Sequence, residues 1–201
     1  MLAQSCPNHR RGVPRRAWSQ RFIWLVLLAP LIGPTAAAEV APRVPLTATS
    51  VPGRAMPRLE ATLTIEAPVD KVAALVADCD RFGEFMDVEK SKVIERRGNI
   101  KRCKLVVDVP FPFGSLESVN EETEERSPGI VRESWKLVSG DFYYDEGFWE
   151  LKPTPQGYTQ VRYVALVEPK LPVPRSMLLG GQKDYIRDML LKLRKRLLTR
   201  P

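Results

Sequence analysis

The stretch that decides the fold is Ile186-Arg-Asp-Met189-Leu190-Leu-Lys-Leu193-Arg-Lys-Arg-Leu197, near the end of a chain of 201 residues. Its apolar residues recur at intervals of three and four, so they fall on one face of a long helix, and basic residues fill the rest of its surface. A helix with one apolar stripe must bury that stripe against another element. The remainder of the domain therefore has to supply a large apolar face.

Most of the chain ahead of this helix predicts strands. Segments rich in β-branched and aromatic residues follow one another, separated by turn signals such as Gly98-Asn99 and Ser127-Pro-Gly129. Their short spacing favours antiparallel pairing, because parallel strands need long crossover connections. The six expected strands are Ser91–Arg96, Lys101–Pro110, Leu116–Glu124, Ile130–Val138, Tyr143–Lys152 and Thr159–Val167.

A seventh strand and two short helices come first. Residues Leu59 to Glu66 alternate between apolar and polar, which is typical of a strand with one buried face. Ala67-Pro68 then opens a helix, since proline is favoured at a first helical position, and Arg81–Met86 predicts a second short helix. We therefore expect an α+β fold in which a seven-stranded curved antiparallel sheet is covered by the long C-terminal helix.

This order of elements, with the residues that fill it, resembles the START/SRPBCC superfamily, which has the helix-grip fold. The resemblance extends over about Leu59 to Leu198 and favours the branch of polyketide cyclases and coenzyme Q-binding proteins. It implies a cavity between sheet and helix but no particular reaction, because members share a fold more than a chemistry. The matching segments are Ile65–Pro68, Asp80–Met86, Leu137–Phe142, Glu146–Trp149 and Pro169–Pro172.

The N-terminal residues 1–38 have the features of a secretory signal peptide. Five arginines and no acidic residue precede an apolar run from Phe22 to Ile32, and Ala36-Ala-Ala38 follows. We expect cleavage and an exported, periplasmic or secreted protein; the alternative is an uncleaved anchor, although the run is shorter than the roughly 20 residues that span a bilayer. Residues 39–57 contain four prolines and predict a flexible or extended linker, so the domain is expected at 58–201.

Charge and histidine content exclude several functions. The net charge is +7, but +5 of it lies in the leader, so the sequence does not predict nucleic-acid binding. The single histidine, His9, also lies in the leader. The mature chain would then lack the base of a Ser-His-Asp or Cys-His site and the commonest metal ligand, so we expect no cofactor, no metal and no catalytic residue of those types. Cys79 and Cys103 are compatible with a disulfide or with two buried thiols.

Strand alternation places rows of large side chains on one face of the sheet, where they would line a pocket or simply form the core. The expected ligand-binding residues are Phe82, Phe85, Met86, Leu105, Val107, Trp135, Trp149, Tyr163, Met177 and Met189. Asp141, Glu146 and Arg132 are the polar candidates for orienting a ligand. Asp141 also fits a simple turn role. Arg132 and Glu133 are otherwise expected to face solvent on alternating sides.

The sequence thus favours a carrier or binding protein for a lipid, an isoprenoid quinone or a polyketide-like aromatic. One alternative is a cyclase- or dehydratase-like enzyme that uses Asp, Glu, Tyr or Arg, and another is a scaffold with a filled core. A buried carboxylate in an open cavity would favour the enzyme, and purely apolar walls would favour the carrier. We expect a monomer, and the basic C-terminal helix allows transient contact with an anionic membrane surface or a merely solvated face.

Overall fold

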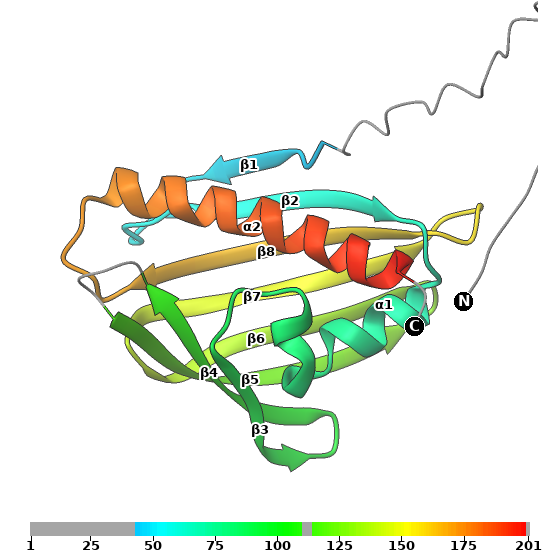
Figure 1. Cartoon of the computed structure of the whole chain (residues 1–201), viewed down its shortest axis with the longest axis horizontal. Helices are drawn as coiled ribbons and strands as arrows, with labels where there is room; N and C mark the ends of the chain where they lie inside the picture. The colour runs from blue at the N-terminus through cyan, green and yellow to red at the C-terminus, as the bar shows by residue number, and fades with distance from the viewer. Residues whose placement is uncertain (1–42, 110–113, 200–201) are drawn as a thin grey trace, which may run out of the picture. The chain divides into compact units, whose positions relative to one another are not determined.

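Eight strands form one antiparallel sheet in the computed structural model, which describes residues 43–109 and 114–199 (Figure 1). The strand order across the sheet is β1-β2-β8-β7-β6-β5-β4-β3. The expected leader and Pro110, the last residue of one expected strand, lie outside the described residues. The strands are β1 (Leu46–Thr49), β2 (Arg58–Ile65), β3 (Lys90–Arg97), β4 (Ile100–Val109), β5 (Gly114–Ser127), β6 (Ile130–Gly140), β7 (Phe142–Pro153) and β8 (Thr159–Pro169).

Helices cover one face of the sheet. The long helix α2 (Arg175–Leu198) runs across β2 and β8, and α1 (Val69–Val76) packs on the central strands β6 and β7 (Figure 1). The 3₁₀ helix η1 (Cys79–Glu84) follows α1 and contacts the edge strand β3. The stripe predicted from the sequence is the buried face of α2, with Ile186, Met189, Leu190 and Leu193 each at most 3% exposed. The helix-grip α+β fold is therefore confirmed, with the core between the sheet and these helices.

The strand count differs from the seven expected, because residues in the predicted linker join the sheet. β1 pairs antiparallel with β2, so that Leu46 lies opposite Ala61. Met56 is only 1% exposed, and its backbone N–H donates to the Tyr144 hydroxyl at 2.9 Å. A strand of four residues is too short to show the alternation typical of strands. The proline-rich composition around β1 therefore predicted a linker. The folded unit therefore includes residues ahead of position 58.

The first half of α2 lacks two features that usually stabilise a helix. Gly180 and Gly181 have low helix propensity, yet α2 continues through both residues. The helix begins at Arg175 after Pro174, and no side chain caps its first turn. Burial of the stripe from Ile186 onward compensates for the low helix propensity of two glycines.

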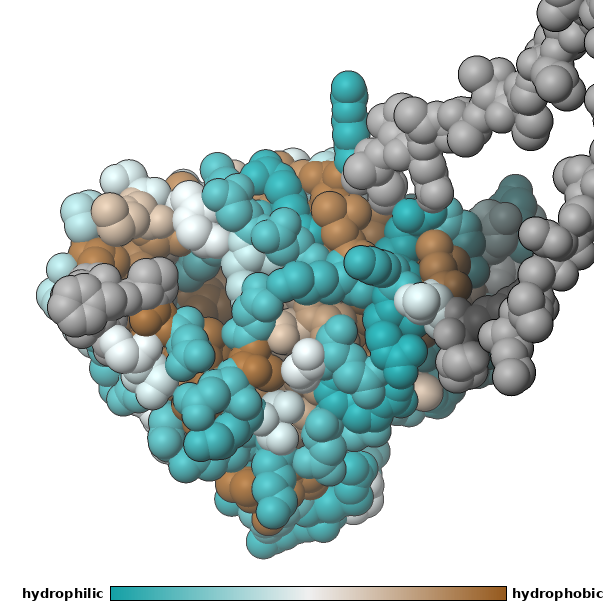
Figure 2. Space-filling model, viewed as in Figure 1, coloured by the Kyte–Doolittle hydropathy of each residue, from teal (hydrophilic) through white to brown (hydrophobic). Residues whose placement is uncertain are grey.

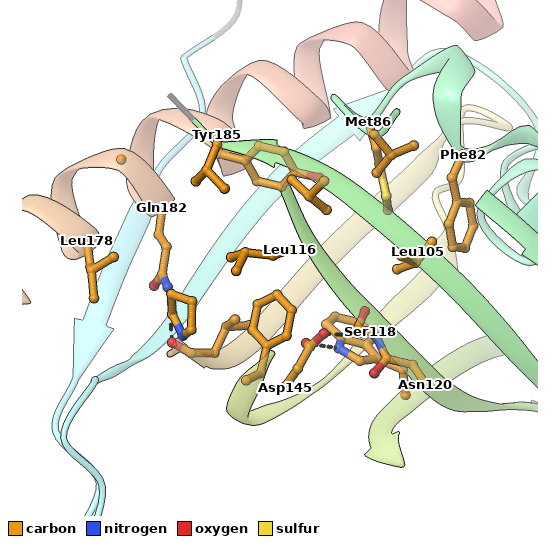
Figure 3. Close-up of a pocket in the computed structure, with 18 of the residues that line it drawn as sticks. Phe82, Met86, Leu105, Leu116, Ser118, Asn120, Asp145, Leu178, Gln182 and Tyr185 are labelled. Atoms are coloured by element: carbon orange, nitrogen blue, oxygen red, sulfur yellow. Dashed lines mark hydrogen bonds between the residues drawn. The ribbon is translucent and has the colours of Figure 1, made fainter. Parts of the chain in front are cut away.

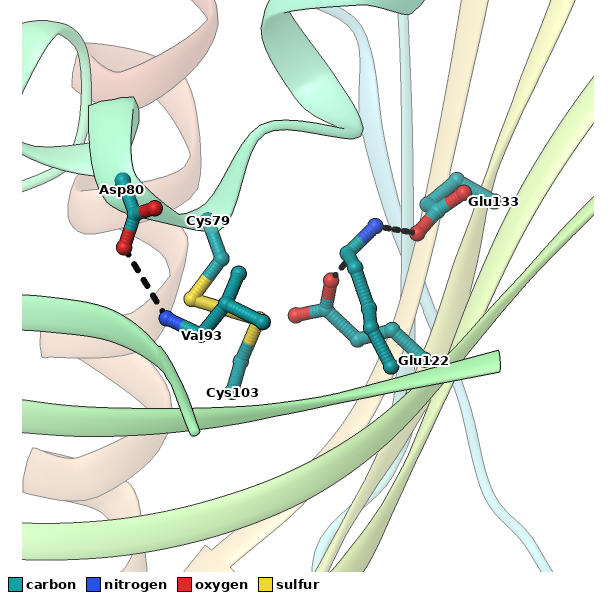
Figure 4. The surroundings of a disulfide bond; sticks show 7 residues. Cys79, Asp80, Val93, Cys103, Glu122 and Glu133 are labelled. Carbon is teal, nitrogen blue, oxygen red and sulfur yellow. Dashed lines mark hydrogen bonds and ion pairs between the residues drawn. A yellow bond between two sulfur atoms is a disulfide. The ribbon is translucent and has the colours of Figure 1, made fainter. Parts of the chain in front are cut away.

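A disulfide joins Cys79 of η1 to Cys103 of β4, with the two Cα atoms 6.1 Å apart (Figure 4). Both residues are fully buried. Of the two readings that the sequence allowed, the structure thus has the disulfide. The bond ties η1, which contributes to the wall of the cavity described below, to the inner face of the sheet.

Replacing both cysteines (Cys79→Ala with Cys103→Ala) should lower the free energy of unfolding by about 2–4 kcal/mol, because the bond closes a loop between residues 24 positions apart. Urea denaturation of the oxidised protein and of the double variant measures the difference. Equal midpoints and slopes for the two proteins would contradict this expectation.

Candidate ligand-binding site

A cavity of about 830 Å³ lies between the inner face of the sheet, η1 and α2 (Figure 3). Strand alternation supplies most of its wall, because every second side chain of the central strands points toward the helices. The interior is therefore hollow, whereas the scaffold alternative predicted a filled core. Apolar and aromatic lining residues include Val76, Phe82, Met86, Val88, Leu105, Val107, Leu116, Trp135, Phe142, Trp149, Tyr163, Val167 and Leu178.

The cavity reaches the surface where α2 begins. Met177, in the first turn of α2, lines the cavity and is 65% exposed. Leu171, Val173 and Pro174, just ahead of the helix, line it as well. Figure 2 shows apolar side chains gathered at this end of the molecule. An apolar ligand would therefore enter past the start of α2.

Aromatic rings form a stiff wall at the inner side. The ring centroids of Trp149 and Tyr163 are 4.5 Å apart, and Trp135 stacks on Tyr163 at 5.5 Å. Phe85 packs edge-on against Trp149 from behind. Such contacts stabilise aromatic pairs beyond the burial of their area, so the rings hold one another in place.

Gly147 makes room for the Trp135 indole. The two residues lie opposite each other on β6 and β7. A Cβ atom at position 147 would lie 2.5 Å from the Trp135 ring and 2.2 Å from the Val164 carbonyl oxygen. Because only glycine fits, the indole can lie across β7, where its Nε1 donates to Asp145 Oδ1 at 2.8 Å.

Asp145 is the centre of the first of two polar groups at the inner end of the cavity. Its second carboxylate oxygen accepts a hydrogen bond from Asn120 Nδ2 at 2.9 Å. Burial raises the pKa of Asp145, and the hydrogen bonds from Asn120 and Trp135 oppose that rise. Asn120 and Asp145 both line the cavity (Figure 3). The two donors, Asn120 on β5 and Trp135 on β6, lie on neighbouring strands and together position the carboxylate.

The second polar group is a buried charge network of Lys101, Glu122 and Glu133 (Figure 4). Lys101 Nζ donates to Glu133 Oε1 at 2.5 Å and lies 3.1 Å from Glu122 Oε2. Burial raises the pKa of Glu122 to about 7, against the lowering effect of Lys101, and burial also raises the pKa of Glu133. One ammonium thus serves two carboxyls, which favours a shared proton on the pair near neutral pH.

Eight of the ten predicted apolar site residues line the cavity: Phe82, Met86, Leu105, Val107, Trp135, Trp149, Tyr163 and Met177. The other two do not. Phe85 and Met189 are each 1% exposed and pack within the core, because η1 turns Phe85 behind Trp149 and the α2 stripe turns Met189 toward the sheet.

None of the three predicted polar residues lines the cavity. Asp141 holds a turn, since its carboxylate accepts from the Glu117 backbone N–H at 2.8 Å. Glu146 lies on the opposite face of β7, where its Oε1 is 3.7 Å from Nη2 of Arg54. Arg132 also lies on that outer face, where it pairs with Glu150 and stacks over Phe148.

The larger polar residues that line the cavity were not predicted from the sequence, although the alternation of the strands indicates that their side chains point inward. Asp145 lies two positions before Gly147, and Glu133 lies two before Trp135, so both share the inner face of their strands. Glu133, expected in solvent, is in fact 3% exposed. On β5 the same parity places Asn120 and Glu122 inside. Residue type alone favours solvent for these side chains, whereas their position in the alternation places them inside.

The curved sheet, the long gripping helix and the cavity between them define a START-like hydrophobic-ligand-binding domain. Residues 65–194 match the family described as polyketide cyclase / dehydrase and lipid transport. The chain therefore belongs to this family. Among curated proteins, none matches the sequence.

Solved structures support the same fold. A STAR-related lipid transfer protein from Xanthomonas axonopodis is 18% identical, with a TM-score of 0.71 over 81% of this chain and 97% of that one. A START superfamily protein from Mycobacterium smegmatis is 18% identical, with a TM-score of 0.59 over 70% and 96%. The Zhui aromatase/cyclase from Streptomyces sp. R1128 is 15% identical, with a TM-score of 0.55 over 69% and 92%. At these identities the likeness concerns the fold.

The described residues contain neither a metal-binding cluster nor a helix that could span a membrane. No group of three or more His, Cys, Asp or Glu side chains within 43–109 and 114–199 is placed to hold a metal ion. No helix in that same part of the chain is long and apolar enough to cross a membrane.

Glu122→Gln should change how stability depends on pH. A carboxyl whose pKa is higher in the folded state favours folding at acidic pH, and this contribution is lost as the pH rises from about 4.5 toward about 7. Between about pH 5 and about pH 8, the wild type should lose about 2 kcal/mol of unfolding free energy relative to the variant. Urea melts of both proteins at the two pH values measure it, and parallel pH profiles would contradict it.

Gly147→Ala should lower the free energy of unfolding by about 1–3 kcal/mol, because the new methyl group forces Trp135 or β8 to move. Gly83→Ala is the matched control, since a Cβ there meets nothing within 4 Å. Thermal melts and near-ultraviolet circular dichroism of the tryptophans measure the effect. Equal stability of the two variants would mean that Trp135 adapts without cost.

Proposed function

We propose that this protein holds one hydrophobic small molecule in the cavity and acts as a carrier or binding protein for it. The observation that carries the proposal is the cavity itself, about 830 Å³ in volume, walled by apolar and aromatic side chains. Cavities of ligand-binding sites fall mostly within about 300–1,000 Å³. Burial of apolar surface supplies affinity without a fixed direction, and the polar inner end supplies orientation. A lipid, an isoprenoid quinone or a polyketide-like aromatic satisfies the first requirement.

We propose further that the protein is exported, with residues 1–38 as a cleaved signal peptide. The basic head, short apolar run and Ala-x-Ala site support this. The disulfide supports it too, because such bonds persist in oxidising compartments.

Contact of the basic helix with an anionic membrane receives less support. Most of the cations on α2 are paired with carboxylates: Arg187 with Asp184, Lys192 with Asp87, Arg194 with Glu66 and Arg196 with Glu84. These ion pairs reduce the positive potential that such contact requires. The proposed carrier function therefore does not depend on it.

The test is native mass spectrometry of the protein purified gently from its own cells, followed by organic extraction. A co-purifying molecule at one per chain is expected. Val107→Trp, which fills the cavity from β4, should remove it while leaving the fold intact. Ile94→Trp is the control, because Ile94 is 52% exposed on β3 and does not line the cavity.

A molecule retained by Val107→Trp at wild-type occupancy would place binding outside the cavity and contradict the proposal. Near-ultraviolet circular dichroism of each variant shows that the loss does not come from unfolding. The control variant should keep the wild-type occupancy.

A cyclase- or dehydratase-like enzyme is the second candidate, and the buried carboxyls of Glu122, Glu133 and Asp145 favour it. With its pKa raised to about 7, Glu122 is poised to exchange a proton at neutral pH. Incubating the extracted molecule with fresh protein separates the two functions. A carrier returns it with unchanged mass, whereas an enzyme converts it and loses that activity in Glu122→Gln.

A further inference from the structure

The charged side chains around the cavity are all of one sign. Among the described lining residues, the ionisable groups other than tyrosine are carboxyls: Asp108, which is exposed, and Glu122, Glu133 and Asp145, which are buried. The buried cation Lys101 is not part of the wall and pairs with two of these carboxyls. An anionic ligand group entering this end would meet carboxylates and no free cation, which is unfavourable in a low-dielectric interior.

The geometry around Asp145 shows what kind of group fits instead. Both oxygens of this carboxylate already accept hydrogen bonds, one from Trp135 and one from Asn120, so the arrangement suits the acceptor form. A carboxylate has about four acceptor positions, which leaves capacity for further donors. Because Asn120 Nδ2 faces Asp145, the amide oxygen of Asn120 must point elsewhere.

That amide oxygen is the second observation. Asn120 is 2% exposed and lines the cavity, and its Oδ1 has no hydrogen-bond partner in the described part of the chain. The same holds for Glu133 Oε2. Buried polar atoms are nearly always hydrogen-bonded, and the amide oxygen of Asn120 can only accept. The Ser118 hydroxyl, from the same strand as Asn120, adds a group that accepts or donates (Figure 3).

From this arrangement we infer that the ligand is an apolar molecule whose polar end donates hydrogen bonds, and that Asp145 and Asn120 receive them. A hydroxyl or a protonated amine has this chemistry. A carboxylate or an ester carbonyl, which only accepts, is selected against. The inference rests on the proposed ligand-binding function and defines the class of ligand that the cavity takes.

Four probes that share a twelve-carbon chain and differ in their polar head group test the inference: dodecanol, dodecylamine, methyl dodecanoate and dodecanoate. Each is titrated at neutral pH against the purified protein loaded with Nile red, an uncharged fluorescent reporter. Dodecanol or dodecylamine should displace the reporter at a concentration about tenfold lower than either acceptor-only probe, as expected for one buried hydrogen bond. The tighter of the two donors distinguishes a hydroxyl ligand from an ammonium ligand.

Asp145→Asn is the test variant, because it puts an amide donor where the site needs an acceptor. The preference for the donor probes should fall about tenfold in this variant. Glu146→Gln is the matched control, since it makes the same change one residue along β7 on the outer face, and it should keep the preference. Circular dichroism and reporter binding show whether each variant is folded. If Asp145→Asn is unfolded, the four-probe series on the wild type still tests the inferred head group.

The outcomes separate the two levels of the proposal. If no probe displaces the reporter, or the reporter does not bind, the proposed ligand-binding function fails. If all four probes displace it equally well, or dodecanoate binds most tightly, the cavity binds apolar molecules but the inferred head group is wrong. An unchanged preference in folded Asp145→Asn also overturns the inference.

Discussion

The contact between the Trp135 indole and the bare backbone of Gly147 holds the interior of this protein in place. Through it the ring lies across β7, stacks on Tyr163 and reaches Asp145 with its N–H. The aromatic wall and the polar inner end of the cavity therefore share one anchor. A side chain at position 147 would displace the Trp135 ring and, with it, the donor of Asp145. The shape of the cavity and the position of its carboxylate therefore both depend on glycine at this position.

The buried charges are costly to keep. Lys101 and Glu133 are at most 5% exposed, as is Glu122, and well-packed apolar residues in their place would often be as stable or more stable. Their presence beside a cavity is more easily explained by what they do for a bound molecule than by what they do for the fold. They also set limits on any engineering of the site, because removing Lys101 alone would leave two carboxyls without a counter-ion.

The sequence predicted the fold well because its signals were long and periodic. The stripe ending at Leu197 and the six consecutive strand patterns each span enough residues for the helical or strand period to show. β1 was not predicted, because four residues are too few to show the alternation of a strand and because an edge strand needs little apolar content. The burial of Met56 was not predicted, because its environment includes residues distant in the chain, such as Tyr144, 88 positions away, whose hydroxyl accepts from the Met56 backbone N–H.

The site was predicted in part, and the difference is instructive. Large apolar residues such as Trp149 and Leu105 were placed correctly on the inner face by alternation. The inner acidic residues were not predicted, because residue type favours solvent for Glu133 and Asp145, although their positions in the alternation put both side chains inside. Phe85 and Met189 share the chemistry of the lining residues, and only the packing of η1 and α2 shows that they lie behind the wall.

An open sheet has two free edges, and each is a template on which a strand of another molecule can pair. In this protein β1 forms one edge and is only four residues long. At the other edge, β3 has a bulge between Val93 and Glu95, and five of its eight residues are charged. Short length, irregular register and charge each oppose intermolecular pairing. The hollow interior is thus bounded by a sheet whose two edges oppose pairing with other molecules.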